Sequence, residues 1–411
     1  MRKIYCAAEE HAANPANVML LGDIMDKRGE LLSRFQNTMQ TIYMDPPFYT
    51  GKMFYHKQRV GEAGWRYGKP AISLPAYSDQ WRSEDEFLSL LRNAAELSHS
   101  LLKEDGSLFL HIDSRKHAQA RFLLDEIFGR DNFVNEIIWA YRTGGRSMNR
   151  FSQKHDTILY YRKSRDVYFN LEAVGVRRAE ARRNHMKKSV DDSGRAFRSI
   201  RSNGKEYRYY DDSLVYPSDV WQDISHLQQK DPQRSGFDNQ KPVKLLERIL
   251  LCSSRPGDMV CDLFAGSGTT GVAAASINRR FLLMDVSPVA IAVSRSRLLG
   301  FPVRIEAPTS EGSPGITAIT SPNLGTVSIE LCSYKLEDGL CDFSPGGLDA
   351  VDQISAGYIR GGVFVSLDSA ARSGARPGIN GTREIPLLDG RPALLTVDIL
   401  GRRFVHEVGE S

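Results

Sequence analysis

The sequence predicts an α/β protein built on a parallel sheet whose two faces are covered by helices. Short apolar runs at 18–22, 41–44 and 107–112 are typical of buried strands, and apolar residues recur at helical spacing over 87–101. The two kinds of segment alternate along the chain, which is the pattern of a sheet with crossover helices. The same alternation resumes over 241–299, so we expect two stretches of one sheet on either side of an intervening segment.

The expected elements follow a regular order in both stretches. Gly106, shortly after the helix at 87–101, is a stop signal for it. The first stretch should contain a strand at 18–22, a helix at 29–37, a strand at 41–44, a helix at 87–101, a strand at 107–112 and a helix at 115–128. The second stretch should contain a helix at 241–253, a strand at 259–264, a helix at 269–277, a strand at 281–285 and a helix at 288–299.

A basic segment separates the two stretches. Residues 141–210 contain 18 Lys and Arg against 7 Asp and Glu, a local excess of 11, so the rest of the chain has −7 of the total net charge of +4. Basic and aromatic residues interleave there and the periodicity weakens. Positive charge concentrated on an otherwise acidic chain indicates a nucleic-acid-binding region, although a solvated charged loop explains the charge alone.

The last hundred residues have a different composition. After residue 307 the chain becomes rich in Gly, Pro and Ser, and apolar residues alternate with polar ones at 327–331, 363–367 and 395–399, as in half-buried strands. We therefore expect a small β-rich C-terminal appendage. The domain boundaries predicted in this way are 1–162, 163–236 for the insertion, 237–306, and 307–411 for the appendage.

Composition excludes several classes of protein. The sequence has no run of about 18 apolar residues that could span a bilayer, and its first residues have no apolar signal-peptide core. The five cysteines are scattered and form no CxxC pair, which favours reduced thiols in a cytosol and argues against a zinc site. We expect a cytoplasmic protein without membrane or metal.

A glycine-rich turn follows the predicted strand at 259–264. Glycines let a backbone approach a ligand closely and adopt positive φ without strain. Asp285, 19 positions after Gly266, ends the next strand, where a carboxylate can accept hydrogen bonds from both ribose hydroxyls of a nucleoside cofactor. Gly266, Gly268 and Gly271 also fit the GxGxxG pattern of dinucleotide-binding folds. The turn therefore predicts a nucleoside cofactor without deciding which one.

The tetrapeptide Asp45-Pro46-Pro47-Phe48 directly follows a predicted strand. It therefore lies at the carboxyl end of that strand, where α/β folds place their sites. Its prolines fix φ and favour extended backbone whose carbonyls lack partners. The amino group of an extruded base can donate to the Asp45 carboxylate and to the Pro46 carbonyl. Both acceptors would stabilise the positive charge that develops on a nucleophilic amine, and Phe48 can stack on the base.

These motifs resemble those of a known family. Residues 45–48 are similar to the DPPY motif of amino-methyltransferases, 262–270 to their FxGxG cofactor loop, and 239–246 to the QKP helix that precedes this loop. The order of the motifs and the basic insertion is that of the permuted class β of N6-adenine and N4-cytosine DNA methyltransferases, which includes type II and type III modification enzymes and the cell-cycle-regulated adenine methyltransferase. The resemblance covers about residues 15–305. It implies a Rossmann-like S-adenosylmethionine-dependent methyltransferase sheet with an inserted target-recognition region.

Carried over residue by residue, the resemblance assigns roles to individual side chains. Asp45 would accept the amino hydrogens and Phe48, which replaces the usual Tyr, would stack on the base, with Pro46 and Pro47 completing the catalytic motif. Asp285 would bind the ribose; Asp23 would contact the cofactor, support the wall of the site, or be a surface turn residue. The other expected cofactor residues are Lys241, Pro242, Asp262, Phe264, Ala265, Gly266, Ser267, Gly268 and Thr269. The phosphate contacts expected in the basic insertion are Arg177, Arg178, Arg182, Arg183, Lys187 and Lys188.

The resemblance implies transfer of a methyl group from S-adenosylmethionine to adenine N6 at specific sites in double-stranded DNA, by a prokaryotic, nucleoid-associated enzyme. A restriction subunit or a second copy of the chain is a candidate partner. Three alternatives remain. Cytosine N4 is methylated by the same fold, more commonly with Ser in place of Asp45; a dinucleotide-dependent oxidoreductase would leave residues 45–48 without a role; and the intact tetrapeptide argues against a non-catalytic DNA-binding subunit.

Overall fold

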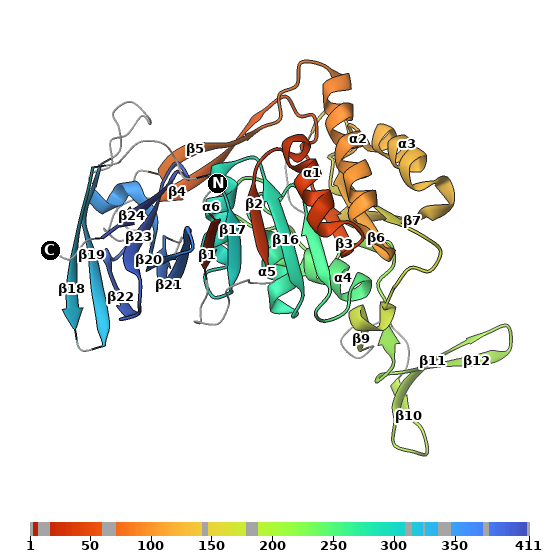
Figure 1. Ribbon diagram of the computed structural model, residues 1–411. Coiled ribbons are helices and arrows are strands. Elements are labelled where there is room, and N and C mark those ends of the chain that lie inside the picture. Colours follow the sequence, from red (N-terminus) through yellow and green to blue (C-terminus); the bar gives the residue numbers. More distant parts are fainter. Residues whose placement is uncertain are drawn as a thin grey trace.

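The centre of the protein is a run of parallel strands within a 14-stranded sheet (Figure 1). The structure is a computed structural model that describes residues 3–6, 17–59, 71–141, 147–177, 188–308, 315–323, 325–335, 347–372 and 378–408. In order across the sheet, the parallel strands of this part of the chain are β6 (Leu102–Ile112), β3 (Met39–Met44), β15 (Met259–Asp262), β16 (Arg280–Asp285), β2 (Val18–Leu21) and β17 (Val303–Glu306). The two stretches predicted from the sequence therefore meet twice, at β3 and β15 and again at β16 and β2.

Beyond this centre the sheet is mixed, and here the expectation of a parallel sheet is wrong. On one side, β8 (His155–Arg162) is antiparallel both to β6 and to β7 (Phe133–Ala140), and β14 (Val220–Trp221) pairs with β7 in parallel. On the other side, β1 (Lys3–Cys6) is antiparallel to β17. The sheet continues through β21 (Val363–Ala371), β20 (Val351–Arg360), β23 (Arg391–Asp398) and β24 (Arg403–Glu407).

Helices cover both faces of the central strands, as predicted. Along β3, Ile42 and Met44 pack into one core with α1 (Ile24–Phe35), α2 (Glu84–Leu101) and α3 (His117–Phe128). Tyr43 points to the other face and packs into a second core with α4 (Val243–Ser253), α5 (Thr269–Ser276) and α6 (Pro288–Arg297). The alternation along one strand thus builds two cores. Among the helices of the described residues, none is both long and apolar enough to span a membrane.

Two predicted boundaries differ for local reasons. Helix α1 begins at Ile24, well before the predicted start at residue 29, because the Asp23 side chain caps it by accepting a hydrogen bond from the Met25 N–H at 2.7 Å. Strand β6 begins at Leu102, directly after α2 ends at Leu101, so Gly106 lies within the strand and the prediction that it stops the helix is wrong. Short 3-10 turns lie at Arg130–Asn132, Leu171–Val174 and Gly347–Ala350.

The insertion forms small sheets outside the main one. β9 (Val176–Arg177) pairs with β13 (Leu214–Val215), and β10 (Lys188–Val190), β11 (Ala196–Ser202) and β12 (Lys205–Tyr210) form an antiparallel sheet that projects from the body in Figure 1. In the C-terminal part, β18 (Gly315–Asn323), β19 (Thr326–Lys335) and β22 (Thr382–Pro386) form a further sheet, in addition to the strands that extend the central one. That part of the chain is β-rich, as expected.

A long hairpin that the sequence did not predict connects the catalytic half to the C-terminal strands. It consists of β4 (Met53–Arg59) and β5 (Ala71–Ser78), and in Figure 1 it reaches from the region of α2 towards β24. Leu74 and Ala76 of β5 are buried in one cluster with Val293 of α6 and Ile354 of β20. The hairpin is therefore anchored by the C-terminal strands while its end at Tyr77 and Ser78 lines the candidate site.

Candidate active site

The carboxyl ends of three neighbouring parallel strands open into one cavity of about 400 Å³. Register places Asp262, at the end of β15, beside Tyr43 of β3 and Leu283 of β16. The chain leaves these strands at Asp45, at the glycine turn and at Asp285, and all three segments line the cavity. The sheet thus brings together motifs that lie more than two hundred residues apart.

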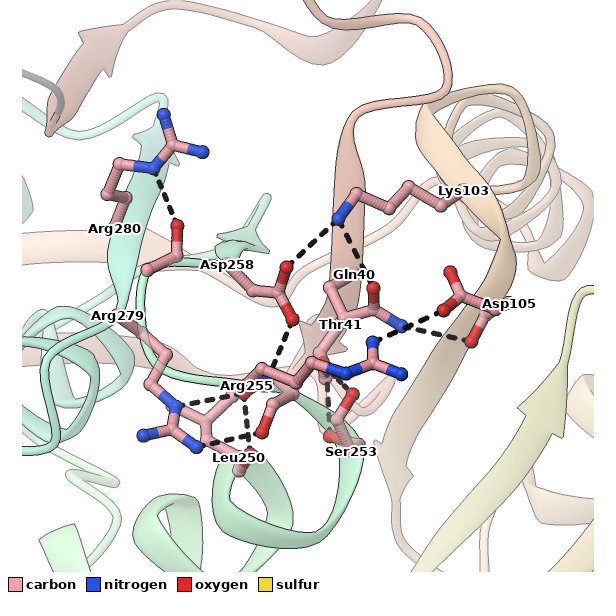
Figure 2. Close-up of polar contacts among 12 residues, drawn as sticks. Gln40, Thr41, Lys103, Asp105, Leu250, Ser253, Arg255, Asp258, Arg279 and Arg280 are labelled. Carbon is pink, nitrogen blue, oxygen red and sulfur yellow. Dashed lines mark hydrogen bonds and ion pairs between the residues drawn. The ribbon is translucent and has the colours of Figure 1, made fainter. Parts of the chain in front are cut away.

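A polar network at the amino ends of β3 and β15 fixes these strands relative to each other (Figure 2). Lys103 Nζ donates to Asp258 Oδ1 at 3.0 Å and to Gln40 Oε1 at 3.3 Å. The buried Thr41 hydroxyl donates to the Ser253 carbonyl at 2.9 Å. The Lys103–Asp258 and Thr41–Ser253 contacts join the two sequence stretches, so they fix β3 and β15 relative to each other along the strand direction. They therefore also fix the position of the catalytic tetrapeptide relative to the glycine turn, at the opposite ends of the same strands.

The glycine turn has the backbone geometry that its sequence predicts. Gly266 and Gly268 have φ values of +51° and +73°, in the left-handed region that disfavours other residues. A Cβ on Gly268 would lie 2.6 Å from Ser294 Oγ, so a larger residue would also clash there. Asp285 accepts hydrogen bonds from the N–H groups of Gly266 and Ser287, both at 2.8 Å. The carboxylate therefore pins the turn and keeps further lone pairs for a ligand.

Burial raises the pKa of two carboxyl groups beside the glycine turn, those of Asp262 and Asp285. Burial raises the pKa of Asp262 to about 7, against hydrogen bonds from the Thr270 hydroxyl and the Phe264 N–H that favour its charged form. Burial likewise raises the pKa of Asp285 to about 6. Hydrogen-bond donors that bind either group would stabilise its charged form and lower the pKa again.

The Asp45 carboxylate has one occupied and one free oxygen. Oδ2 forms an ion pair with Lys241 Nζ, whereas Oδ1 is buried without a hydrogen-bond partner. The Lys241 ammonium also lies 5.3 Å from the centre of the Phe48 ring, within the range of a cation–π contact. A buried acceptor without a partner is costly, and this one belongs to a residue that lines the cavity. It is therefore suited to accept a hydrogen bond from a ligand.

Phe48 stacks on a histidine that sequence analysis did not single out. The rings of Phe48 and His111 lie 5.8 Å apart at 21°, and His111 is fully buried. Its Nδ1 is hydrogen-bonded to the Tyr43 hydroxyl at 2.8 Å and its Nε2 to Asp156 at 3.2 Å. Burial raises the pKa of Asp156, but the hydrogen bond and charge interaction with His111, the positive charge of Lys241 and the hydrogen bond from Tyr141 together hold that pKa below its usual range. The Phe48 ring therefore packs on a histidine ring whose orientation is fixed by hydrogen bonds at both of its nitrogens.

An aromatic wall from the unpredicted hairpin also lines the cavity. Tyr77 stacks between Phe54, at 4.8 Å and 18°, and Phe237, at 6.3 Å and 19°. The Tyr77 hydroxyl accepts a hydrogen bond from Asn239 Nδ2 at 3.0 Å. Tyr77, Phe237 and Asn239 all line the cavity. Asn239 begins the segment 239–246 singled out from the sequence, but no local motif marks Tyr77 or Phe237, because only the tertiary fold brings β5 to the segment before the QKP sequence.

Most of the predicted site residues line this cavity. Those that do are Asp23, Asp45, Pro47, Lys241, Asp262, Phe264, Ala265, Gly266, Ser267, Thr269 and Asp285. Four others lie just behind the lining: Pro46 is buried, Phe48 flanks the Lys241 ammonium, and Pro242 and Gly268 cap α4 and α5. Asp23 lines the cavity and is also exposed as the N-cap of α1, a position that was not predicted for it from the sequence. Binding and catalysis by these residues stay predictions.

The predicted phosphate contacts are only partly within the described residues. Arg177 is exposed on β9, and Lys188 is exposed on β10, where it forms an ion pair with Asp211 at 3.2 Å. Neither residue lines the cavity. Arg178, Arg182, Arg183 and Lys187 lie outside the described residues.

Comparison with known proteins identifies the family. The N6/N4 methyltransferase family model, described as DNA methylase, matches residues 39–295. The chain therefore belongs to this family of DNA methylases, which confirms the resemblance inferred from the motifs.

Individual relatives are distant. The chain is 26% identical over 292 residues to the type II methyltransferase M.EcaI of Enterobacter cloacae, covering 60% of this chain and 61% of that protein. It is 27% identical over 287 residues to the DNA adenine methyltransferase YhdJ of Escherichia coli strain K12, covering 69% and 83%. Among solved structures, the cytosine-N4-specific PvuII DNA methyltransferase is similar with 18% identity and a TM-score of 0.44, covering 70% and 90%. The chain spans about three fifths of the length of M.EcaI.

Proposed function

We propose that the protein is a site-specific DNA methyltransferase that transfers the methyl group of S-adenosylmethionine to adenine N6 in double-stranded DNA. One observation carries the proposal: the buried, unpartnered Asp45 Oδ1 belongs to the same cavity as the glycine turn and Asp285. An acceptor for an amino group and a cradle for a nucleoside therefore share one space. Membership of the DNA methylase family supports the same chemistry.

The residues of the cavity fit S-adenosylmethionine. A volume of about 400 Å³ lies in the range of about 300–1,000 Å³ that is usual for small-molecule sites. The Asp285 carboxylate, oriented by the Gly266 N–H, would accept hydrogen bonds from the ribose hydroxyls. Ser267 and Thr269 would face the methionine end. When bound, the cofactor supplies a methyl group on a positively charged sulfur, which makes its carbon electrophilic.

The catalytic tetrapeptide would act on the target base after the base leaves the duplex. The amino group would donate one hydrogen to Asp45 Oδ1 and the other to the Pro46 carbonyl, which leaves the nitrogen lone pair free to bond to the methyl carbon as the bond from that carbon to sulfur breaks. The carboxylate would stabilise the positive charge on nitrogen until the extra proton passes to solvent. Phe48, supported by His111, would present a flat apolar surface to the base.

Adenine is favoured over cytosine by Asp45, since Ser is the more common residue at this position in cytosine-N4 enzymes. The relative YhdJ is named as an adenine methyltransferase. Other relatives include the type III EcoPI Mod subunit of Escherichia phage P1, 23% identical over 366 residues, so a restriction subunit is a candidate partner for this chain as well. The projecting sheet β10–β12 and the basic insertion around it would contact the duplex.

Methylation-aware sequencing of a host that expresses the chain tests this proposal. We expect N6-methyladenine at one recurring sequence, and no such mark in a host that expresses the Asp45→Ala variant. Detection of N4-methylcytosine at a recurring sequence would show that the target base is cytosine rather than adenine. Absence of any new methylated base with the wild-type chain, under conditions in which the protein is folded and abundant, would contradict the function.

A further inference from the structure

We infer that Lys241 recognises the target base directly, by donating a hydrogen bond to the ring nitrogen beside the amino group. The inference rests on the proposed function and adds a specificity-determining residue to it. Sequence analysis assigned Lys241 to the closure of the cofactor pocket. Its ammonium also contacts the two side chains that are expected to bind the base: it forms an ion pair with Asp45 Oδ2 and lies over the ring of Phe48.

The Asp45–Lys241 pair presents an acceptor next to a donor. Asp45 Oδ1 is a buried acceptor without a partner, and Lys241, with a side chain that is only 10% exposed, has N–H donors beyond the one bound to Oδ2. The pairing edge of adenine offers the complementary pattern, with a donor at N6 beside an acceptor at N1. The pairing edges of guanine and thymine offer a carbonyl acceptor beside a ring N–H donor, which this pair would repel.

The fold fixes the main chain of Lys241 against the cofactor turn. Its carbonyl accepts a hydrogen bond from the Thr269 hydroxyl at 3.2 Å, and Arg297 Nη1 donates to the same hydroxyl at 2.9 Å and to the Ser267 carbonyl at 2.7 Å. The main chain of Lys241 is therefore fixed at the cofactor turn, and its ammonium is held at Asp45 by the ion pair. The ion pair also keeps the two recognition groups neutral as a unit, so an uncharged base can replace solvent there without leaving a charge unpaired.

A purely structural lysine would neutralise Asp45 without touching the base, and a base analogue separates the two cases. 1-Deazaadenine retains the amino group but lacks the ring nitrogen that Lys241 would contact. Single-turnover methyl transfer is measured on duplexes that differ only by adenine or 1-deazaadenine at the mapped target. The enzymes are the wild-type chain, Lys241→Met, and the matched control Lys244→Met, which alters an exposed lysine in the first turn of α4, three residues after Lys241. Cofactor affinity and melting temperature are measured in parallel.

We expect the wild-type chain and Lys244→Met to transfer methyl to the analogue about 10- to 100-fold more slowly than to adenine, the range of one hydrogen bond to a charged group. Lys241→Met should be slow on adenine and lose little further on the analogue, because both changes remove the same bond. The intrinsic reactivity of the analogue cancels when the ratio of the two rates is compared between enzymes, because every enzyme acts on the same two bases.

Two outcomes would overturn the inference while leaving the proposed function intact. One is an equal rate of methyl transfer to adenine and to 1-deazaadenine by the wild-type chain, a result that does not depend on whether the variants fold. The other is undiminished discrimination by Lys241→Met. Absence of transfer to any duplex by the wild-type chain would instead overturn the proposed function together with the inference.

Discussion

The buried carboxylate of Asp79 accepts a hydrogen bond from the backbone N–H of Thr50 at 2.8 Å. The same carboxylate accepts from the N–H groups of Tyr49 at 3.0 Å and Phe48 at 3.2 Å. It therefore fixes the chain directly after the catalytic tetrapeptide, where Tyr49 has a left-handed φ of +61°. Trp81 Nε1 completes the set with a hydrogen bond to Asp79 Oδ1 at 2.8 Å.

Asp79→Asn should slow methyl transfer and lower stability. The new amide NH₂ would face backbone donors, so at least one of them loses its acceptor, at a cost of about 1–3 kcal/mol. Thermal melting reports the stability, and single-turnover transfer reports the placement of Phe48. Asp85→Asn, a change at an exposed position on α2, is the control. An Asp79→Asn variant with the transfer rate and melting temperature of the wild type would show that the carboxylate does not position the motif.

Asp285→Ala should weaken S-adenosylmethionine binding by about 1.5–3 kcal/mol, the value of a charge-assisted hydrogen bond. Calorimetric titration measures this loss, and titration with NAD in parallel tests the oxidoreductase alternative. DNA affinity measured without cofactor should hardly change. Unchanged cofactor affinity would mean that the glycine turn binds another ligand.

Cofactor affinity should fall as the pH is lowered from 7 to 5. Burial raises the pKa of Asp285 to about 6 in the free protein, and ribose hydroxyls prefer the ionised carboxylate. Below pH 6 binding must therefore release a proton from Asp285, which costs up to about tenfold in affinity per pH unit. Asp285→Asn should bind weakly with a flatter pH profile. An identical pH profile in both proteins would assign the dependence to another group, such as Asp262.

Phe48→Tyr should retain methyl transfer, because it keeps the ring and adds only the hydroxyl found in the family motif. Phe48→Ala should lose the surface on which the base stacks, a contact of about 1–3 kcal/mol. Fluorescence of 2-aminopurine at the target position measures base extrusion for each variant. Equal extrusion and equal transfer by Phe48→Ala would exclude a stacking role.

DNA affinity should fall steeply with salt concentration, because each neutralised phosphate releases nearly one counterion. Replacing Arg177, Arg178, Arg182 and Arg183 with Ala should reduce both the affinity and the salt slope while cofactor affinity stays close to normal. Binding to one duplex at several salt concentrations measures the slope. The same slope in the variant would show that these arginines do not contact phosphates.

Features of the site that depend on local sequence were predictable. The glycine turn and the tetrapeptide each combine residue types and spacing whose chemistry is visible within ten residues, and residues of both line the cavity. Most strands and helices of the centre were predictable for the same reason, since apolar periodicity is local. The family order of motifs then placed both segments in one sheet.

Features that depend on contacts between distant segments were not predictable from one sequence. Asp79 lies in an unremarkable polar stretch, and its role appears only when β5 brings it under residues 48–50. Nothing in the sequence around His111 distinguishes it from an ordinary buried histidine in a strand, and its role is visible only from the stacking of its ring on Phe48. The resemblance assigned Lys241 to the cofactor pocket, which it lines, but its ion pair with Asp45 became visible only in the fold.

The most direct test of the account is single-turnover transfer of labelled methyl from S-adenosylmethionine to a duplex that contains the mapped site, by the wild-type chain and by Asp45→Ala, with cofactor and DNA binding measured on the same preparations. Asp45 is proposed to act on charge that exists only in the transition state. We therefore expect transfer to fall by about 10²–10³ or more while both binding affinities stay largely in place. Near-wild-type transfer by Asp45→Ala would contradict the proposed mechanism.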